Sequence, residues 1–430
     1  MGNRPLAAMS AAFAPPRLVA HVVNRLDDGG AGNGLLDLIA HMPGDRYRHA
    51  VLCLGEDGIY HADLREQGVE VIDLHRRGAA GAGRFNPGLV LRMVRTLRVL
   101  RPDVVHTRDL GGLEGQLAAA LAGVRLRVHG EYGRDDGRAF GRDHEYGCEY
   151  GLAAAEPRRA RPTSLLRRML RPLVGHYIAA SAEQERWLIE QVGAAPSRVS
   201  HISNGVDSLQ FHPRLGPHAT VGPEGFMRDD AFVIGSVGRM DDAKNDVTLV
   251  ESFLRLISSP HAAHGRLRLL MVGDGPLRAE CQAMLERAGA GHRAWLPGER
   301  LDTAQLMRAM DLMVLPALAE GKGKVLLEAM ATGLPVVATS VGVHKELVQP
   351  GLTGILVPPL SPDVMAAAIA DYCRIPEMGA RHGARARGQV IAHHSLPAMA
   401  RSYLAVYDGL AGGEPGPRPG SAAGQRGGAW

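Results

Sequence analysis

Four charged residues in the second half of the sequence have the types and spacing needed to bind a phosphorylated substrate. Arg239 and Lys244 lie five residues apart, directly after the apolar run AFVIGSVG. Arginine offers a two-pronged donor and lysine a point charge, so together they can clamp a diphosphate. A solvated charged turn is the alternative for this pair. Glu320 and Glu328 lie eight residues apart. A helix beginning near Gly323 would project Glu328, with Glu320 on the preceding loop, so both acids could reach into one cleft from one wall.

The alternative for the two acids is a helix-terminal acid together with a surface acid. That alternative fits Glu328 poorly, because VLL precedes it and AM follows it, and a carboxylate in such an apolar run needs a partner.

Glycine-rich loops follow two of the apolar runs and would let main-chain N–H groups approach a phosphate. The first is DDGGAGNG, which contains Gly29 and Gly30 and precedes an apolar helical segment. Its G-x-G-x-G spacing breaks the G-x-G-x-x-G fingerprint of dinucleotide-binding proteins. The second is GDGP, which contains Gly273 and Gly275. Each loop taken alone also fits an ordinary turn.

Two histidines in the first half, His106 and His129, end candidate strands. In open parallel sheets the carboxyl ends of the strands face the ligand, so both are candidate site residues, with a structural role as the alternative. The sequence has no Asp-x-Asp, a common arrangement for holding a divalent cation on a nucleotide diphosphate. We therefore expect no metal ion or other cofactor, and we expect side chains and helix ends to neutralise a diphosphate.

The elements that must position these residues alternate along the chain as short apolar runs and helix-length segments. This pattern predicts an α/β protein with parallel sheets. The predicted strands are 17–23, 49–54, 69–74, 103–107, 126–130, 176–180 and 198–202, then 231–238, 267–273, 292–297, 311–316, 334–339 and 354–359. Helix starts with capping-box spacing are predicted at Ser181, with Gln184, and at Asp302, with Gln305.

A polar segment rich in Pro and Gly separates two similar halves, so we expect two domains. The predicted organisation is a disordered tail (1–16), an N-terminal domain (17–212), a linker (213–228), a C-terminal domain (229–394), a final helix (395–410) and a second disordered tail (411–430).

Composition narrows the class of protein. The chain has 430 residues, a net charge of +4 and 4% aromatic residues, which gives little support for nucleic-acid binding. No apolar run is long enough for a membrane span, and the first residues make a poor signal peptide. The four cysteines are far apart and form no C-x-x-C, so we expect neither a disulfide framework nor a zinc site, and a cytoplasmic location.

The order of the motifs resembles that of the retaining glycosyltransferases of family 4, which have the GT-B fold. The shared motifs are GRM…K, VGDGP, ISNGVD, the E-x7-E element, GLPVVAT and the Gly-Gly loop, over about residues 17 to 410. Segments such as HVVNRLDDGG, RPDVVHTRDL and VHGEYGRD resemble sugar transferases of exopolysaccharide and exosortase gene systems. The resemblance implies two Rossmann-like domains facing each other across a cleft, with the last helix crossing back to the first domain.

The resemblance also implies roles for individual residues in sugar transfer from a nucleotide-diphosphate donor to a glycan or lipid-linked acceptor, with retention of configuration. The implied catalytic residues are Glu320 near the donor sugar, His129 in the cleft, and Arg239 and Lys244 on the diphosphate. The implied substrate-binding residues are Gly29, Gly30, Asn204, Gly273, Gly275, Gly321 and Glu328, the last on the ribose.

The sequence departs from the family pattern at Gly32, where an acid is usual, at Gly323 and Lys324, where a small residue and Asn are frequent, and at Val343 with His344, in place of part of a glycine turn. These departures keep open a catalytically impaired nucleotide-sugar-binding subunit of a polysaccharide assembly complex. A sugar-nucleotide epimerase of the same fold is a second alternative. A nicotinamide or flavin oxidoreductase is disfavoured by the broken glycine fingerprint.

The basic segment 156–173 predicts a short amphipathic helix. Its apolar residues from Leu165 to Leu170 gather on one side, and Arg167, Arg168 and Arg171 gather on another. Such a helix can rest on anionic lipid at the inner membrane face, and an ordinary surface helix is the equal alternative.

Overall fold

The computed structural model describes residues 15–24, 26, 30–55, 58, 60–75, 86–132, 162–217, 221–227, 230–259 and 265–412. Apart from residues 15, 16, 411 and 412, both tails that were predicted to be disordered lie outside the described residues. Residues 156–161 of the basic segment also lie outside them. The chain divides into two compact units. The first unit comprises the described residues up to 132 and those within 162–203 and 399–412. The second unit comprises the described residues within 204–398. The described residues within 213–228, predicted to be a linker, are grouped with the second unit.

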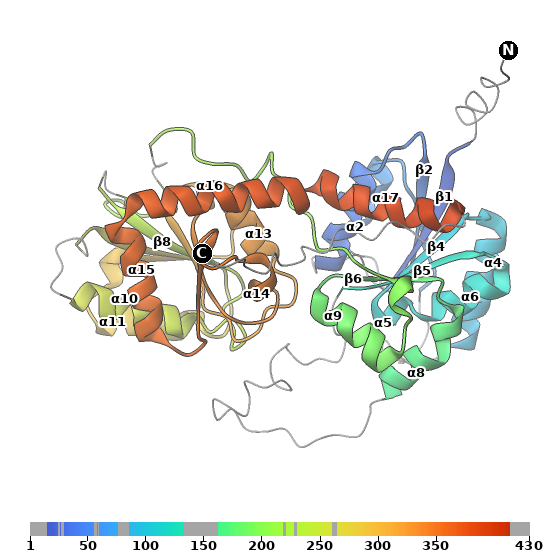
Figure 1. Ribbon diagram of the computed structural model, residues 1–430, viewed down its shortest axis with the longest axis horizontal. Helices are drawn as coiled ribbons and strands as arrows, with labels where there is room; N and C mark the ends of the chain where they lie inside the picture. Colours follow the sequence, from blue (N-terminus) through green and yellow to red (C-terminus); the bar gives the residue numbers. More distant parts are fainter. Residues whose placement is uncertain are drawn as a thin grey trace, which may run out of the picture. The chain divides into compact units, whose positions relative to one another are not determined.

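The first unit contains a parallel sheet with the strand order β3-β2-β1-β4-β5-β6-β7 (Figure 1). Its strands are β1 (Arg17–Val23), β2 (Tyr47–Cys53), β3 (Glu70–Asp73), β4 (Val104–Arg108), β5 (Leu126–Glu131), β6 (His176–Ala179) and β7 (Val199–His201). The helices are α2 (Gly30–His41), α3 (His61–Glu66), α4 (Pro87–Leu100), α5 (Asp109–Gly112), α6 (Glu114–Ala122), α8 (Pro162–Leu170) and α9 (Ala182–Trp187). The strand order is that of a doubly wound nucleotide-binding fold.

The second unit repeats this plan with the parallel order β10-β9-β8-β11-β12-β13. Its strands are β8 (Phe232–Val237), β9 (Leu267–Val272), β10 (Ala294–Gly298), β11 (Leu312–Leu315), β12 (Val336–Thr339) and β13 (Gly354–Val357). Its helices are α10 (Asp246–Ser258), α11 (Arg278–Arg287), α12 (Thr303–Arg308), α13 (Lys324–Ala331), α14 (His344–Leu347), α15 (Pro362–Arg374) and α16 (Pro376–His393). The predicted α/β class with two parallel-sheet domains is confirmed.

Alternating side chains of the second sheet build a core on each face. Val233 and Met313 pack on one face with α13 and α16. Ile234 and Leu312 pack on the other with α10, α11 and α15. A strand covered on both faces reads as a continuous apolar run, which is why the strands were visible in the sequence.

Local signals set the ends of several helices. Ser181 caps α9, because its hydroxyl accepts a hydrogen bond of 3.2 Å from the N–H of Gln184. Asp302 precedes α12 as predicted but makes no side-chain cap. Its two carboxylate oxygens each accept a 2.8 Å hydrogen bond from Arg300, so the acid is already occupied.

The last helix, α17 (Leu396–Gly412), packs on the first unit from Met399 onward. The Tyr407 hydroxyl lies 2.8 Å from Nδ1 of His106, and the Tyr403 hydroxyl lies 2.8 Å from that of Tyr132. Asp408 accepts a 2.8 Å hydrogen bond from Tyr47. His106, which the sequence suggested as a candidate site residue at the end of a strand, therefore contacts this helix.

Candidate active site

The carboxyl ends of β8 and β11 bring Lys244 and Glu320 into direct contact in the second unit. The Lys244 ammonium donates a hydrogen bond to Oε2 of Glu320. Oε1 of Glu320 accepts the N–H of Gly323 at 3.2 Å. Burial raises the pKa of Glu320, but the neighbouring Lys244 charge and its hydrogen bond outweigh burial, so the pKa lies below its ordinary value. Glu320 is therefore held ionised beside a fixed cation.

A small pocket opens at this pair. Its lining residues are Ser236, Val237, Gly238, Lys244, Asp246, Leu315, Pro316, Ala317 and Glu320. The position is where open α/β sheets bind ligands, beyond the carboxyl ends of their parallel strands. A pocket with one cation, two acids and main-chain groups can hold an anionic substrate and orient a polar one.

Asp246 is a site residue that the sequence reasoning missed. It is the first residue of α10, and its Oδ1 accepts a 3.4 Å hydrogen bond from the Ser236 hydroxyl. Burial raises the pKa of Asp246 to about 7, because the Lys244 charge and the Ser236 hydrogen bond offset the burial only in part. An acid two residues after Lys244, in the turn that leads from a strand to a helix, was the available signal.

Gly273 and Gly275 hold the β9 turn against the β8 turn. A Cβ on Gly273 would lie 1.9 Å from the carbonyl oxygen of Gly238, and one on Gly275 would lie 2.3 Å from that of Met240. The N–H of Gly273 donates to Gly298 O at 2.9 Å, and that of Gly275 donates to Asp274 Oδ1 at 2.7 Å. The two amides are engaged inside the unit, and the glycines serve close backbone packing.

Arg239 and Glu328 occupy different surroundings from the pocket pair. The Arg239 side chain is 75% exposed, and its Nε lies 3.8 Å from Asp241. Glu328 is buried on α13, with Oε1 3.9 Å from the Lys324 ammonium. Neither residue is among those that line the pocket, whereas Lys244 and Glu320 both line it and contact each other.

The loop that carries Glu320 is supported from two sides. Asn204 donates a 3.3 Å hydrogen bond to the carbonyl of Lys322, which places the ISNGVD motif beside Gly321 and its neighbours. On the other side, the N–H of Val343 donates to the Glu320 carbonyl at 3.0 Å.

Two departures from the family pattern meet in this loop. A Cβ on Gly323, which has a φ of 60°, would lie 2.9 Å from Cγ1 of Val343. The side chain present at Val343 therefore fits a glycine at 323, so the two substitutions are compatible with each other. His344 lies next to them, is fully buried, and has its Nδ1 3.0 Å from the Thr339 carbonyl.

His129 lies in the first unit, inside a chain of buried hydrogen bonds. Its Nδ1 is 2.7 Å from the Thr107 hydroxyl, and its Nε2 is 3.1 Å from Oε1 of Glu131. Gln116 in turn donates to the Thr107 hydroxyl at 2.7 Å. Both ring nitrogens of His129 are thus engaged within its own unit. Gly30 is the first residue of α2, and Gly29 lies outside the described residues.

Arg167 corrects the predicted basic face of the segment 156–173. Its guanidinium donates to both oxygens of Glu131, at 2.6 and 3.0 Å, and stacks over the ring of Trp187. Burial raises the pKa of Glu131, but the His129 hydrogen bond and the Arg167 charge outweigh burial and lower the pKa to about 2. Arg167 is therefore a buried partner of Glu131 and does not belong to an exposed basic surface.

Comparison with known proteins places glycosyltransferase regions on both units. Residues 28–208 match the model described as Glycosyltransferase Family 4, and residues 231–374 match that described as Glycosyl transferases group 1. Lys244 and Glu320 fall inside the second match.

Two relatives illustrate the similarity in sequence. One is a D-inositol 3-phosphate glycosyltransferase of Geodermatophilus obscurus, 30% identical over 54% of this chain and 53% of its own length. Another is a UDP-Gal:alpha-D-GlcNAc-diphosphoundecaprenol alpha-1,3-galactosyltransferase of Escherichia coli, 27% identical over 62% of this chain and 65% of its own length. The match thus spans about half to two thirds of these curated relatives.

Among solved structures, Anabaena Alr3699/HepE in complex with UDP has a similar fold, with a TM-score of 0.69 and 21% identity over 91% of this chain and 99% of that one. The chain therefore has the two-domain α/β architecture of GT-B glycosyltransferases, with a family 4 region followed by a group 1 region.

Proposed function

We propose that this protein is a glycosyltransferase that moves a sugar from a nucleotide-diphosphate donor to a hydroxyl of a glycan or lipid-linked acceptor. The observation that carries the proposal is the Lys244–Glu320 pair, set in a pocket at the strand ends of the unit that matches the group 1 model. The names of the relatives add support, since they include a D-inositol 3-phosphate glycosyltransferase and a galactosyltransferase named for UDP-Gal.

The pocket suits the chemistry of sugar transfer. Negative charge develops on the departing diphosphate, and a fixed cation in a partly dry site stabilises it without reorganisation. Lys244 supplies that cation, and Glu320 orients it and faces the sugar. We propose retention of configuration, as the family resemblance implies, with Glu320 positioning the sugar and no protein nucleophile required. We also propose that the reaction needs neither a metal nor another cofactor, because side chains neutralise the diphosphate.

The proposed setting is exopolysaccharide synthesis at the cytoplasmic side of the inner membrane. This setting rests on the resemblance of the N-terminal segments to transferases of exopolysaccharide gene systems. No helix in the described part of the chain is both long and apolar enough to cross a bilayer.

A thermal-shift panel of UDP, GDP, ADP and their sugars tests donor binding. We expect one base to raise the melting temperature well above the others, since a ligand that binds only the folded state stabilises it by mass action. No shift with any member would contradict the proposal. Transfer of label to an acceptor would then exclude the two alternatives: an epimerase converts the donor without an acceptor, and an impaired binding subunit gives no product.

Asp246 gives the donor site a predicted pH dependence. Its pKa of about 7 means that the carboxylate becomes charged as the pH rises through neutrality, next to the proposed diphosphate. Nucleotide affinity should therefore fall between pH 6 and pH 8. In Asp246→Asn that part of the fall should disappear, while the titration of the nucleotide itself remains as a common background. Calorimetric titrations of both chains at each pH measure this, and parallel pH profiles would refute the role of Asp246.

The pKa of Asp246 also predicts a change in stability. A carboxyl whose pKa is raised on folding binds more protons when folded, so its destabilising effect grows as the pH rises from about 4 to about 7. Asp246→Asn should accordingly raise the melting temperature more at pH 8 than at pH 4.

We also propose a peripheral membrane contact through α8 that does not involve Arg167. Arg167 is buried. Among the residues of the segment whose burial the structure describes, the exposed ones are Leu165 and Met169, at 60% and 68%, together with Arg168, Arg171 and Pro172. Sedimentation with anionic vesicles should pull down the protein, and Leu165→Ser with Met169→Ser should reduce the bound fraction. Equal sedimentation of the wild type with neutral and anionic vesicles would end this part of the proposal.

A further inference from the structure

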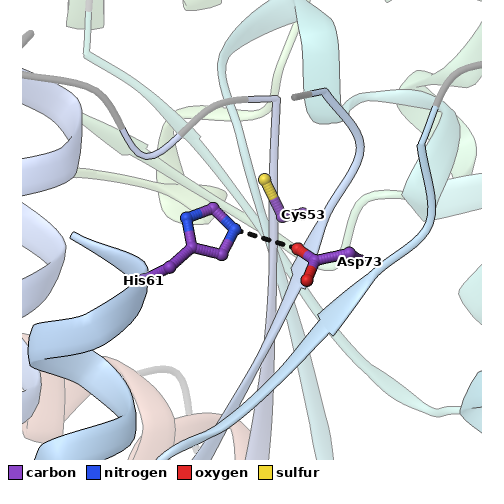
Figure 2. A group of neighbouring side chains, drawn as sticks. All are labelled: Cys53, His61 and Asp73. Atoms are coloured by element: carbon purple, nitrogen blue, oxygen red, sulfur yellow. Dashed lines mark hydrogen bonds and ion pairs between the residues drawn. The ribbon is translucent and has the colours of Figure 1, made fainter. Parts of the chain in front are cut away.

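Three side chains of metal-ligating type converge at one edge of the first unit's sheet: Cys53, His61 and Asp73 (Figure 2). Cys53 is the last residue of β2, and Asp73 is the last residue of β3. They are direct partners in the parallel register, so their side chains lie on the same face of the sheet. His61 begins α3, the helix that connects these two strands. One β-α-β crossover thus supplies all three groups.

The spacing of the three groups suits a single small cation. One ligand atom from each residue lies within 4.8 Å of the other two. Zinc bonds of about 2.0–2.3 Å to N, O and S in a tetrahedral arrangement place ligand atoms about 3.4–3.6 Å apart. To reach this spacing the His61–Asp73 pair, now 2.9 Å apart, must open slightly and any wider pair must close, both by side-chain rotation.

The contacts of Nδ1 with the backbone of Gly58 orient the ring of His61. Nδ1 lies 2.9 Å from both the carbonyl and the N–H of Gly58, so either tautomer is supported. Nε2 points at Oδ1 of Asp73, 2.9 Å away (Figure 2). When Nδ1–H donates to the carbonyl, the Nε2 lone pair faces a carboxylate oxygen, and a cation bound by both atoms would satisfy them once they move about 0.5 Å farther apart. This arrangement of a backbone carbonyl behind a ligating histidine is common in metal sites.

The surroundings match those of a protein metal site. Cys53 is fully buried, and the apolar side chains of Leu26, Leu64 and Val69 belong to the same cluster. The Asp73 side chain is 20% exposed, which leaves a path from solvent. Arg65 donates a 3.1 Å hydrogen bond to Oδ2 of Asp73, so Oδ1 remains directed at His61.

We propose that Cys53, His61 and Asp73 bind one Zn²⁺, with water as the fourth ligand, and that the ion ties the edge strand β3 and helix α3 to β2. A thiolate, an imidazole and a carboxylate form a mixed set that zinc accepts readily. The ion has a structural role in the first unit, separate from sugar transfer. The absence of a C-x-x-C pair predicted no zinc site. The proposed set instead combines one cysteine with a histidine from the next helix and an aspartate from the next strand.

Cobalt substitution tests the proposal without any assay of activity. In a Cys148→Ser background, which removes the cysteine outside the described residues, Co²⁺ should give a thiolate charge-transfer band and the strong visible absorption of a four-coordinate site. Zn²⁺ should abolish both signals with a stoichiometry near one. A spectrum that lacks the thiolate band would overturn the proposal.

Variants identify the ligands. Cys53→Ser and Asp73→Asn should each weaken zinc binding by at least about ten- to a hundred-fold in competition with a chelator. Cys281→Ser, at another buried cysteine, is the matched control and should bind zinc as the wild type does. Circular dichroism establishes that each variant is folded. Zinc affinity unchanged in folded Cys53→Ser, or lost equally in Cys281→Ser, would contradict the assignment.

Discussion

Replacing Lys244 by alanine should lower the rate of sugar transfer by about a hundred- to a thousand-fold, the usual cost of removing one preorganised donor from a developing anion. In the structure the Lys244 ammonium donates to Glu320 in the pocket, and among the residues that the structure describes no other cation lines that pocket. The loss should appear mainly in kcat, because the charge on the leaving diphosphate is greatest in the transition state. Steady-state kinetics with the donor found in the nucleotide panel measure it.

Two companion variants separate catalysis from folding. Glu320→Gln keeps the shape of the side chain and its acceptor for the Gly323 N–H, but it removes the charge that orients Lys244. It should also slow transfer while keeping a cooperative unfolding transition. Arg287→Ala, at an exposed position at the end of α11, is the control and should transfer at the wild-type rate. Wild-type kcat in Lys244→Ala would remove the lysine from the mechanism.

Replacing Gly273 by alanine should destabilise the protein by about 3–5 kcal/mol, in the range where a single substitution needs a specific structural cause. The cause is twofold. The added Cβ would lie 1.9 Å from a backbone oxygen, and the φ of 137° is one that residues with a side chain rarely adopt. Because the neighbouring atom is main chain, it cannot rotate away. Chemical denaturation followed by circular dichroism gives the change in the free energy of unfolding.

Gly388→Ala is the matched control for this substitution. Gly388 lies within α16, and a Cβ there would meet nothing within 4 Å. Alanine in a helix interior should leave stability unchanged or raise it by about 0.5–1 kcal/mol. If the two alanine variants unfolded at the same denaturant concentration, the close packing of the β8 and β9 turns would not be what Gly273 provides.

The fold was predictable because buried parallel strands leave a simple trace. Each predicted strand overlaps an observed one, since runs such as LRLLMV pack against helices on both faces and are apolar at every position except Arg268. Lys244 and Glu320 were predictable for a related reason. Lys244 follows β8 and Glu320 follows β11, and these two strands pair with each other in parallel in the second unit's sheet.

Features set by side-chain contacts across the fold were not predictable. Arg167 has the spacing of an exposed basic face, yet it reaches Glu131, a residue distant in sequence, and is buried. Gly273 and Gly275 have the pattern of a phosphate loop, but their amides bind inside the unit. Asp246 looks like an ordinary helix-start acid until burial beside Ser236 is known. Periodicity reports which face is covered, and it does not report what covers it.

The most direct test of the account is a crystal structure of the protein with UDP or the preferred nucleoside diphosphate bound. We predict a diphosphate oxygen within hydrogen-bonding distance of the Lys244 ammonium, in the pocket at the ends of β8 and β11, with Glu320 alongside. A nucleotide bound elsewhere in the second unit, with Lys244 and Glu320 paired only to each other, would contradict it.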